Sequence, residues 1–305
     1  MLAKHHDKIL CLLANDFNFD ELLKNGIDYI KENYLILKLS GIDKSVKGDL
    51  KFYVGDEKLN NVFIKNALNG HLKVVKYLVS KGVNIYAKGN QALRWSAMMG
   101  HLKVVKFLLK RGANAYVNKN EAFQLSAENG QLEVVKFLIS KGANIHVNDD
   151  QALQCSANEG HLEMVKYLVS KGANVQVDNN QTLYVSAENG YLEIVKYLVS
   201  QGADIHANND QALRWSAYNG HLKVVKYLVL QGADIHASND EALRWSAKNG
   251  HFEIVKYLVS KGADVCAKDD QALRWSAKNG HLEIVQYLTQ EEQNTNQTTR
   301  SSDEL

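Results

Sequence analysis

Two apolar patterns alternate along most of the chain, and each is typical of a helix with one buried side. Within residues 180–209, a first stretch places Leu183 and Ala187 four positions apart. A second stretch, residues 191–200, carries apolar side chains over a broad side. Because positions three and four apart lie on the same face of a helix, each stretch predicts one helix. The segment therefore predicts a pair of helices packed against each other.

This pair of patterns recurs every thirty residues without an insertion. One glycine series falls at 70, 100, 130, 160, 190, 220, 250 and 280, and a second runs from 82 to 262 in the same steps. Glycine adopts the left-handed conformation at low cost, so each glycine is expected to end a helix. The predicted units are residues 60–89, 90–119, 120–149, 150–179, 180–209, 210–239, 240–269 and 270–289.

One helix pair is too small to bury both of its sides, so neighbouring units must supply the core. The sequence thus predicts an all-α solenoid of stacked helix-turn-helix units. An Asn or Asp precedes the first helix of every unit, as at Asn180 and Asp210. We expect it to cap that helix, with its side-chain oxygen accepting a backbone N–H.

The two flanks differ from the repeats. Residues 1–59 hold fragments similar to the end of a unit, including Phe19-Asp-Glu-Leu-Leu-Lys-Asn-Gly-Ile-Asp28. We interpret this region as degenerate repeats that form an N-terminal cap. Residues 290–305 are polar and lack apolar periodicity, so we expect them to be disordered.

The repeated phrase Ala-Leu-Arg-Trp-Ser-Ala-x-Asn-Gly-His-Leu-Glu resembles the ankyrin repeat over roughly residues 60–289. Two departures stand out. The family's unit is usually about 33 residues long, and Gln-Ala-Leu-Arg stands where the family has Thr-Pro-Leu-His. The missing residues fall in the connector, so the resemblance implies shortened connecting hairpins. The wording of the shortened unit is similar to the ankyrin paralogues of giant DNA viruses such as Mimivirus, which implies a host protein as partner.

Composition narrows the class of protein further. The chain has 36 basic and 34 acidic side chains, and this balance gives no global reason to expect a polyanion partner. The three cysteines, Cys11, Cys155 and Cys266, are far apart and odd in number, so we expect no disulfides. No apolar segment is long enough to span a membrane. We therefore expect an intracellular protein that is not secreted, and the resemblance to viral proteins implies the host cytoplasm.

The recurrent polar residues have structural explanations. Histidines such as His221 and His251 occur once per layer, and stacked helices lie about 8–10 Å apart. Since zinc requires all ligand atoms within about 2 Å of one point, we expect hydrogen bonds at the turns rather than a metal site. Glu193 precedes Lys196 by three positions, the spacing of a helix-surface ion pair. We predict no cofactor and no enzymatic activity.

The positions that vary between units are the candidates for recognition. Three and seven residues after the leading Gln or Glu, the first helices should expose a concave stripe. The last units place Arg, Lys and Tyr there, with tryptophan next to each arginine. The alternative is that the tryptophans are half-buried between layers. The predicted partner-binding residues are Tyr184, Glu188, Arg214, Tyr218, Arg244, Lys248, Arg274 and Lys278.

Two functions compete for this stripe. Tyr, Trp and Arg dominate the energetic centres of protein interfaces, so a non-catalytic scaffold that binds an unidentified protein is favoured. Arginine with exposed aromatic rings also suits single-stranded nucleic acid. We consider nucleic acid the less favoured partner.

Overall fold

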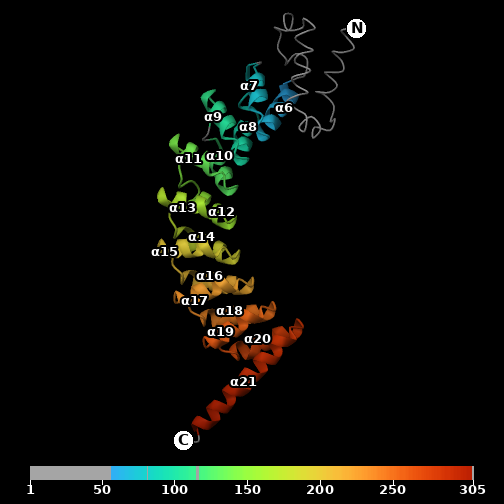
Figure 1. Ribbon diagram of the computed structural model, residues 1–305, viewed down its shortest axis with the longest axis vertical. Coiled ribbons are helices and arrows are strands. Elements are labelled where there is room, and N and C mark those ends of the chain that lie inside the picture. The colour runs from blue at the N-terminus through green and yellow to red at the C-terminus, as the bar shows by residue number, and fades with distance from the viewer. Residues whose placement is uncertain (1–55, 81, 115–116, 304–305) are drawn as a thin grey trace, which may run out of the picture. The chain divides into compact units, whose positions relative to one another are not determined.

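The computed structural model describes residues 56–80, 82–114 and 117–303. All sixteen regular elements in these ranges are α-helices, and no strand occurs there (Figure 1). This confirms the all-α fold, and the described connectors hold turns where longer units would have hairpins. The first helices are α6 (Asp56–Leu68), α8 (Ala87–Met98), α10 (Val117–Glu128), α12 (Gln151–Asn158), α14 (Val177–Glu188), α16 (Ala207–Tyr218), α18 (Ala237–Lys248) and α20 (Ala267–Lys278). The second helices are α7 (Leu72–Ser80), α9 (Leu102–Lys110), α11 (Leu132–Ser140), α13 (Leu162–Ser170), α15 (Leu192–Ser200), α17 (Leu222–Leu230), α19 (Phe252–Ser260) and α21 (Leu282–Asp303).

The helices belong to two compact units. The first comprises Met1–Ser126 and Glu133–Ala143, and the second comprises Ala127–Leu132 and Asn144–Leu305. In the first unit, α6 packs beside α8 and α7 beside α9. In the second unit, the first helices from α12 to α20 form one layer and the second helices from α13 to α21 form the other (Figure 1). Each unit is thus a stack of helix pairs, as the repeat predicts.

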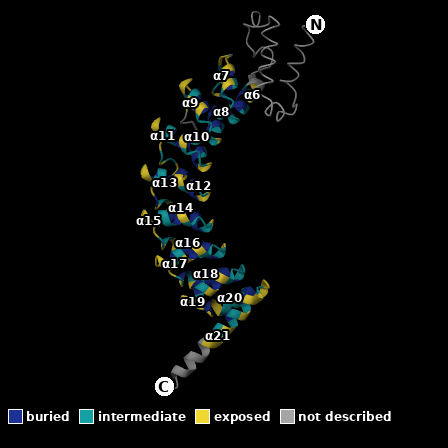
Figure 2. Ribbon diagram, in the orientation of Figure 1, coloured by how far each residue is buried: buried dark blue, intermediate teal, exposed yellow. Residues whose placement is uncertain are grey.

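The core repeats with the sequence. In residues 210–239, Leu213 and Ala217 of α16 and Val225 and Leu228 of α17 are fully buried. Buried segments recur in each successive helix pair of the second unit (Figure 2). Complete burial of a Val or Leu side chain contributes roughly 1.5–3 kcal/mol. Ser216 is buried as well, and its hydroxyl donates to the Leu213 carbonyl oxygen at 2.9 Å, so this small polar side chain is satisfied within its own helix.

In the repeats from α8 to α20, the Asn or Asp before the first helix does not act as the predicted cap. Asn208, Asn209 and Asp210 all have left-handed backbones, with φ of 50°, 59° and 55°. Asn and Asp tolerate this conformation better than other residues with a Cβ. At the equivalent Asp150 no side-chain cap bond forms. The prediction was wrong because the backbone here turns left-handed, which explains the Asn and Asp by a different cause.

The side chain at this position links one connector to the next instead. Asp210 is buried, and its Oδ1 accepts the backbone N–H of Asp234 at 2.9 Å. The same bond, 24 residues apart, joins Asn90 to Asn114, Asp150 to Asn174, Asn180 to Asp204 and Asp240 to Asp264. Only a short side chain with an oxygen can both adopt the turn and reach the connector that follows the second helix.

The repeated histidine makes the predicted structural hydrogen bond. Nε2 of His251 lies 2.9 Å from the Tyr218 carbonyl oxygen, which can only accept, so the imidazole donates. Asn249 Nδ2 donates to the same oxygen at 2.8 Å. Gly220 has φ +83°, and a Cβ there would lie 2.7 Å from the His251 ring. Glycine is therefore required by both its backbone conformation and its neighbour. His161, His221 and His281 donate in the same way to residues 128, 188 and 248.

The C-terminal flank of the repeats is described by the structure, whereas most of the N-terminal flank is not. The tail expected to be disordered from residue 290 is instead helical, because α21 continues to Asp303. Every earlier second helix ends at a glycine, but Glu292 occupies that position in the last unit, so the signal that stops the helix is missing. The predicted N-terminal cap, residues 1–59, lies almost entirely outside the described residues.

Candidate functional site

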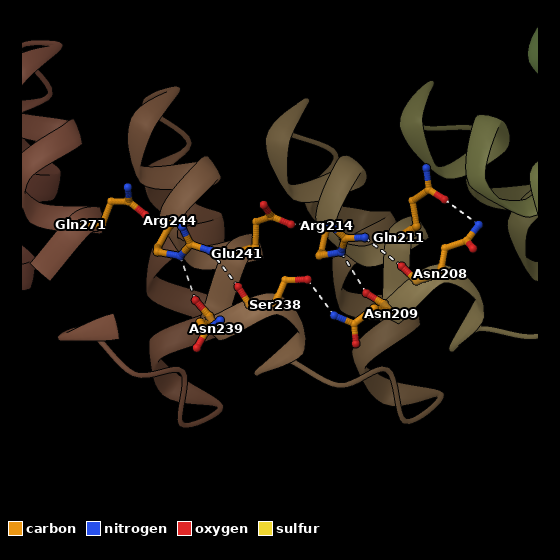
Figure 3. Close-up of polar contacts among 9 residues, drawn as sticks. All are labelled: Asn208, Asn209, Gln211, Arg214, Ser238, Asn239, Glu241, Arg244 and Gln271. Carbon is orange, nitrogen blue, oxygen red and sulfur yellow. Dashed lines mark hydrogen bonds and ion pairs between the residues drawn. The ribbon is translucent and has the colours of Figure 1, made fainter. Parts of the chain in front are cut away.

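The arginines of the predicted stripe bond within the chain. Arg244 Nε donates to the Asn239 carbonyl oxygen and Nη2 to that of Ser238, both at 2.8 Å. Its Nη1 donates to Gln271 Oε1 of the next repeat. Figure 3 shows the guanidinium between these three acceptors. The side chain therefore ties its own left-handed connector to the following first helix.

This arrangement corrects one expectation. Arg244 was predicted to be exposed, but it is buried, with 7% of its surface accessible. Arg214 makes the same bonds to the carbonyls of Asn209 and Asn208 and pairs with Glu241 of the next repeat (Figure 3). The physical reason is that a glutamine or glutamate 27 residues later lies within reach and satisfies the guanidinium.

The tryptophans form a row with two tyrosines. Tyr184 and Trp215 have ring centroids 6.0 Å apart, and Trp215 lies 5.3 Å from Trp245. Tyr218 lies between them, 5.3 Å from Trp215 and 5.4 Å from Trp245. Three of these contacts have the edge-to-face geometry that aromatic pairs prefer, and the Trp215–Tyr218 contact is tilted at 60°. All four rings are also half-buried, so the alternative given for the tryptophans is confirmed, although each ring keeps some surface exposed.

An acidic residue lies near the start of this row. Glu188 is half-exposed and accepts a hydrogen bond from the Tyr184 hydroxyl. Burial of the ring, followed by this bond and the charge of Glu188, raises the pKa of Tyr184 to about 12. The Tyr184 hydroxyl therefore stays protonated at physiological pH and orients the carboxylate.

Basic residues lie at the other end. Lys248 is half-exposed, with its Nζ 5.1 Å from the centre of the Trp275 ring, a distance typical of a cation–π contact. Lys278 is exposed. Arg274 is exposed too, and its Nη2 donates to the Lys268 carbonyl oxygen at 3.0 Å. Of the three arginines predicted to bind a partner, Arg274 is thus the most accessible.

One group of potential metal ligands occurs in the described residues. Ligand atoms of Cys266, Asp270 and Glu292 lie within 4.8 Å of one another. Burial, followed by a hydrogen bond to Asp270 and nearby carboxylates, raises the pKa of the Cys266 thiol to about 11. Since metals bind the thiolate, a metal ion would have to displace the proton of this thiol. Cys266 replaces the histidine that pairs with the equivalent aspartate in other repeats, such as His236 with Asp240 at 3.0 Å.

Sequence reasoning missed the acceptors of the arginine bonds. Glu241 and Gln271 were assigned only as the residues that open a helix. A signal was present, because a Glu or Gln follows the arginine by 27 positions at Arg94, Arg214 and Arg244, and all three pairs are bonded. The separation of 27 residues is the same in all three pairs, as expected when each pair joins one repeat to the next.

Comparisons with known proteins agree with this architecture. The family described as ankyrin repeats (3 copies) matches residues 12–121, 123–209 and 213–299. The ankyrin repeat protein R844 of Acanthamoeba polyphaga mimivirus is 40% identical over 103 residues, which are 30% of this chain and 48% of that protein. The chain therefore spans about half the length of this relative.

Within the described residues, no helix has the length and apolar character needed to cross a bilayer. Ankyrin repeats are generally protein–protein interaction modules and non-catalytic scaffolds. The family matches cover most of the sequence, and the stacked helix pairs place the repeated Ala, Leu, Gly and His in the structural positions derived above. The chain belongs to the ankyrin repeat family.

Proposed function

We propose that the first helices of the second unit bind a protein partner that carries acidic side chains. We define the recognition face as Tyr184, Glu188, Trp215, Tyr218, Trp245, Lys248, Arg274, Trp275 and Lys278. The observation that carries this proposal is the half-exposed aromatic row, which runs through consecutive repeats and ends among basic groups. Tyr and Trp in such a row are the residue types that contribute most to protein interfaces.

The face is held in place before any partner arrives. Arg214 and Arg244, predicted as contacts, support it by fixing the spacing between first helices. Ordering a flexible side chain on binding costs roughly 0.5–1.5 kcal/mol. Because these rings already pack against one another, that cost is largely avoided. We propose this preorganisation as the mechanism of recognition.

The charges on the face indicate an orientation for the partner. Glu188 lies at one end, while Lys248, Arg274 and Lys278 lie in the last two repeats. A segment with acidic groups beside the basic end and none beside Glu188 complements this gradient. Single-stranded nucleic acid is the second candidate, but Arg214 and Arg244 donate within the chain and the rings pack edge to face, which leaves few stacking surfaces.

A peptide selection tests the proposal. Dodecapeptides selected from a random library on the wild-type chain should be rich in Asp, Glu and aromatic residues. Reversing two charges in Lys248→Glu/Lys278→Glu should weaken their binding at least tenfold, about 1.4 kcal/mol, in fluorescence anisotropy. The matched control is Lys256→Glu/Lys261→Glu, which reverses two exposed lysines at the second helix α19 and should bind as the wild type does.

Selected peptides that bind the Lys248→Glu/Lys278→Glu variant as tightly as the wild type contradict the assignment of this face. Tight binding of labelled oligothymidine, lost in the same variant, would instead support the single-stranded nucleic acid. Circular dichroism of each variant checks that the helices remain intact.

The similarity to a mimivirus protein supports one further element of the proposal, that the partner belongs to an infected cell. Selection from a library of peptides tiled across an amoebal proteome tests it. Enrichment of acidic host segments that compete with the random-library peptides is expected. Enrichment of no host segment over a scrambled library would contradict it.

A further inference from the structure

The basic residues of the chain are unevenly distributed. Between Glu57 and Glu121 the sequence has no Asp or Glu, yet it contains twelve Lys and Arg residues. The whole chain has 36 basic and 34 acidic groups, so the rest of the chain contains 24 basic and 34 acidic groups. A nearly neutral protein thus concentrates its positive charge in the first two predicted repeats.

Part of this charge lies on one surface of the first unit. The second helices α7 and α9 pack side by side and carry Lys73, Lys76, Lys103 and Lys106, all exposed. Figure 2 shows exposed segments on both helices. Lys110 and Arg111 extend the exposed charge at the end of α9. We call these six residues the basic face.

The same position carries a glutamate in most later repeats, Lys223 being the exception. Glu133, Glu163 and Glu193 stand where the first two repeats have Lys73 and Lys103, and each pairs with a lysine three residues on at 2.8 Å. Within the described ranges, none of the six cations of the basic face forms an ion pair. With Lys73 and Lys103 in place of glutamate, the surface of α7 and α9 is positive, whereas the later helices with glutamate carry balanced charges.

Aromatic rings support the lysines without covering them. Lys76 Nζ lies 5.9 Å from the centre of the Phe107 ring, and Lys106 Nζ lies 5.2 Å from that of Phe137. The Arg111 guanidinium lies 5.1 Å from Phe107. These contacts hold the charged ends near the surface of the stack and oppose their free rotation. The positive charge is therefore localised.

The character of the face favours phosphate as its ligand. Lysine is a compact point charge that binds phosphate, whereas it is depleted in the cores of protein interfaces. Tyr77, at 36%, is the exposed large hydrophobic residue on α7 and α9, so the face offers little apolar surface for insertion into a membrane. It also offers few rings on which single-stranded bases could stack. Phosphates on a rigid, regular backbone fit it best.

We propose that the basic face binds the sugar-phosphate backbone of double-stranded nucleic acid without sequence preference. Contacts to phosphate position a duplex but read no sequence. If four lysines each replace condensed counterions, the logarithm of the affinity falls with the logarithm of salt with a slope of about −4. This surface is independent of the recognition face, so a partner protein and a duplex could be held by one chain.

Fluorescence anisotropy of a fluorescein-labelled 24-base-pair DNA of mixed sequence, titrated from 50 to 200 mM NaCl, tests the proposal. The wild-type chain should bind with the steep slope, and Lys73→Glu/Lys103→Glu should lose at least tenfold in affinity and about 2 in slope. These substitutions recreate the Glu–Lys spacing of Glu133 and Lys136, which the fold already accepts. Lys73→Gln/Lys103→Gln should give an intermediate loss.

The chain contains a matched control. Residues 221–226 have the same letters as residues 101–106, so Lys223→Glu makes the same change in the same local sequence. It should bind DNA as the wild type does, and Lys103→Glu alone should bind more weakly. Equal effects of the two single changes, or an unchanged affinity in the double variant, overturn the proposal. So would stronger binding to phosphatidylserine vesicles or polyglutamate than to the duplex.

Discussion

The buried guanidinium of Arg244 provides the sharpest test of how the repeats are joined. We predict that Arg244→Ala destabilises the chain far more than Arg274→Ala. The two arginines follow nearly identical phrases, Glu241-Ala-Leu-Arg244 and Gln271-Ala-Leu-Arg274. Their surroundings differ, because Arg244 is buried and bonds to the next repeat, whereas Arg274 is exposed. Comparing the two alanine variants therefore separates the effect of the surrounding structure from that of the local sequence.

The magnitude follows from the bonds that are lost. Arg244 donates to two backbone carbonyls at 2.8 Å and to the side chain of Gln271. A hydrogen bond to a charged group contributes about 1.5–3 kcal/mol. The three bonds are not additive, and water can reach the exposed Asn239, so we expect about 2–3 kcal/mol in total. In Arg274→Ala an exposed side chain loses its hydrogen bond to the Lys268 carbonyl oxygen, and the free energy of unfolding should fall by less than about 1 kcal/mol.

Urea unfolding followed by circular dichroism measures the difference, and amide hydrogen exchange over residues 237–248 reports it locally. Faster exchange in this segment is expected for Arg244→Ala but not for Arg274→Ala, because the lost bonds anchor the connector at Ser238 and Asn239. Arg244→Lys should be intermediate, since an ammonium cannot reproduce the guanidinium fork. If Arg274→Ala proves as costly as Arg244→Ala, the arginine does not join the repeats as described.

Two further predictions concern a glycine and a tyrosine. Gly220→Ala should lower the melting temperature more than Gly232→Ala, because the new Cβ at residue 220 would lie 2.7 Å from the His251 ring. At Gly232 only the backbone strain of about 1–2 kcal/mol applies. Equal shifts in melting temperature would exclude the steric contribution of His251. Glu188→Gln should lower the pKa of Tyr184 from about 12 toward 10, as measured by absorbance at 295 nm against Tyr184→Phe. A pKa raised by folding stabilises the chain below pH 10 and ceases to do so as pH rises to 12, so the variant should lose less stability over that range; an unchanged titration would contradict the bond.

The helices could be predicted from sequence because their causes are local. Apolar spacing specifies which side of a helix is buried, and Gly220 ends a helix whatever lies beyond it. The same reasoning explains the one error at an end. Where Glu292 replaces the terminating glycine, the helix continues, and polar composition alone wrongly suggested disorder.

The roles of the arginines could not be predicted from one unit taken alone. Arg244 looks like a surface residue until Gln271, 27 positions later, is placed beside it. Asp210 likewise suggests a helix cap until Asp234, in the connector after α17, is seen to donate to it. In both cases the partner lies in an element further along the chain, 27 positions away for Arg244 and 24 for Asp210. Local rules give the correct chemistry for such a side chain, an oxygen or a guanidinium needing a bond, but assign it to the wrong partner.

Charge shows the same dependence on neighbouring layers. Lys223 lies on α17, between α15 and α19, which carry the exposed Glu193 and Glu253. Lys103 occupies the same position on α9, but only one of its two flanking positions is acidic, because α7 carries Lys73 and α11 carries Glu133. Stacked helices lie about 8–10 Å apart, close to the Debye length at physiological salt, so a charge is neutralised mainly by the adjacent repeats. The net charge of +2 is a sum over the whole chain, so it does not show how basic and acidic side chains are divided between neighbouring repeats. For a protein built of layers, the charge of adjacent repeats is therefore the quantity that predicts a polyanion partner.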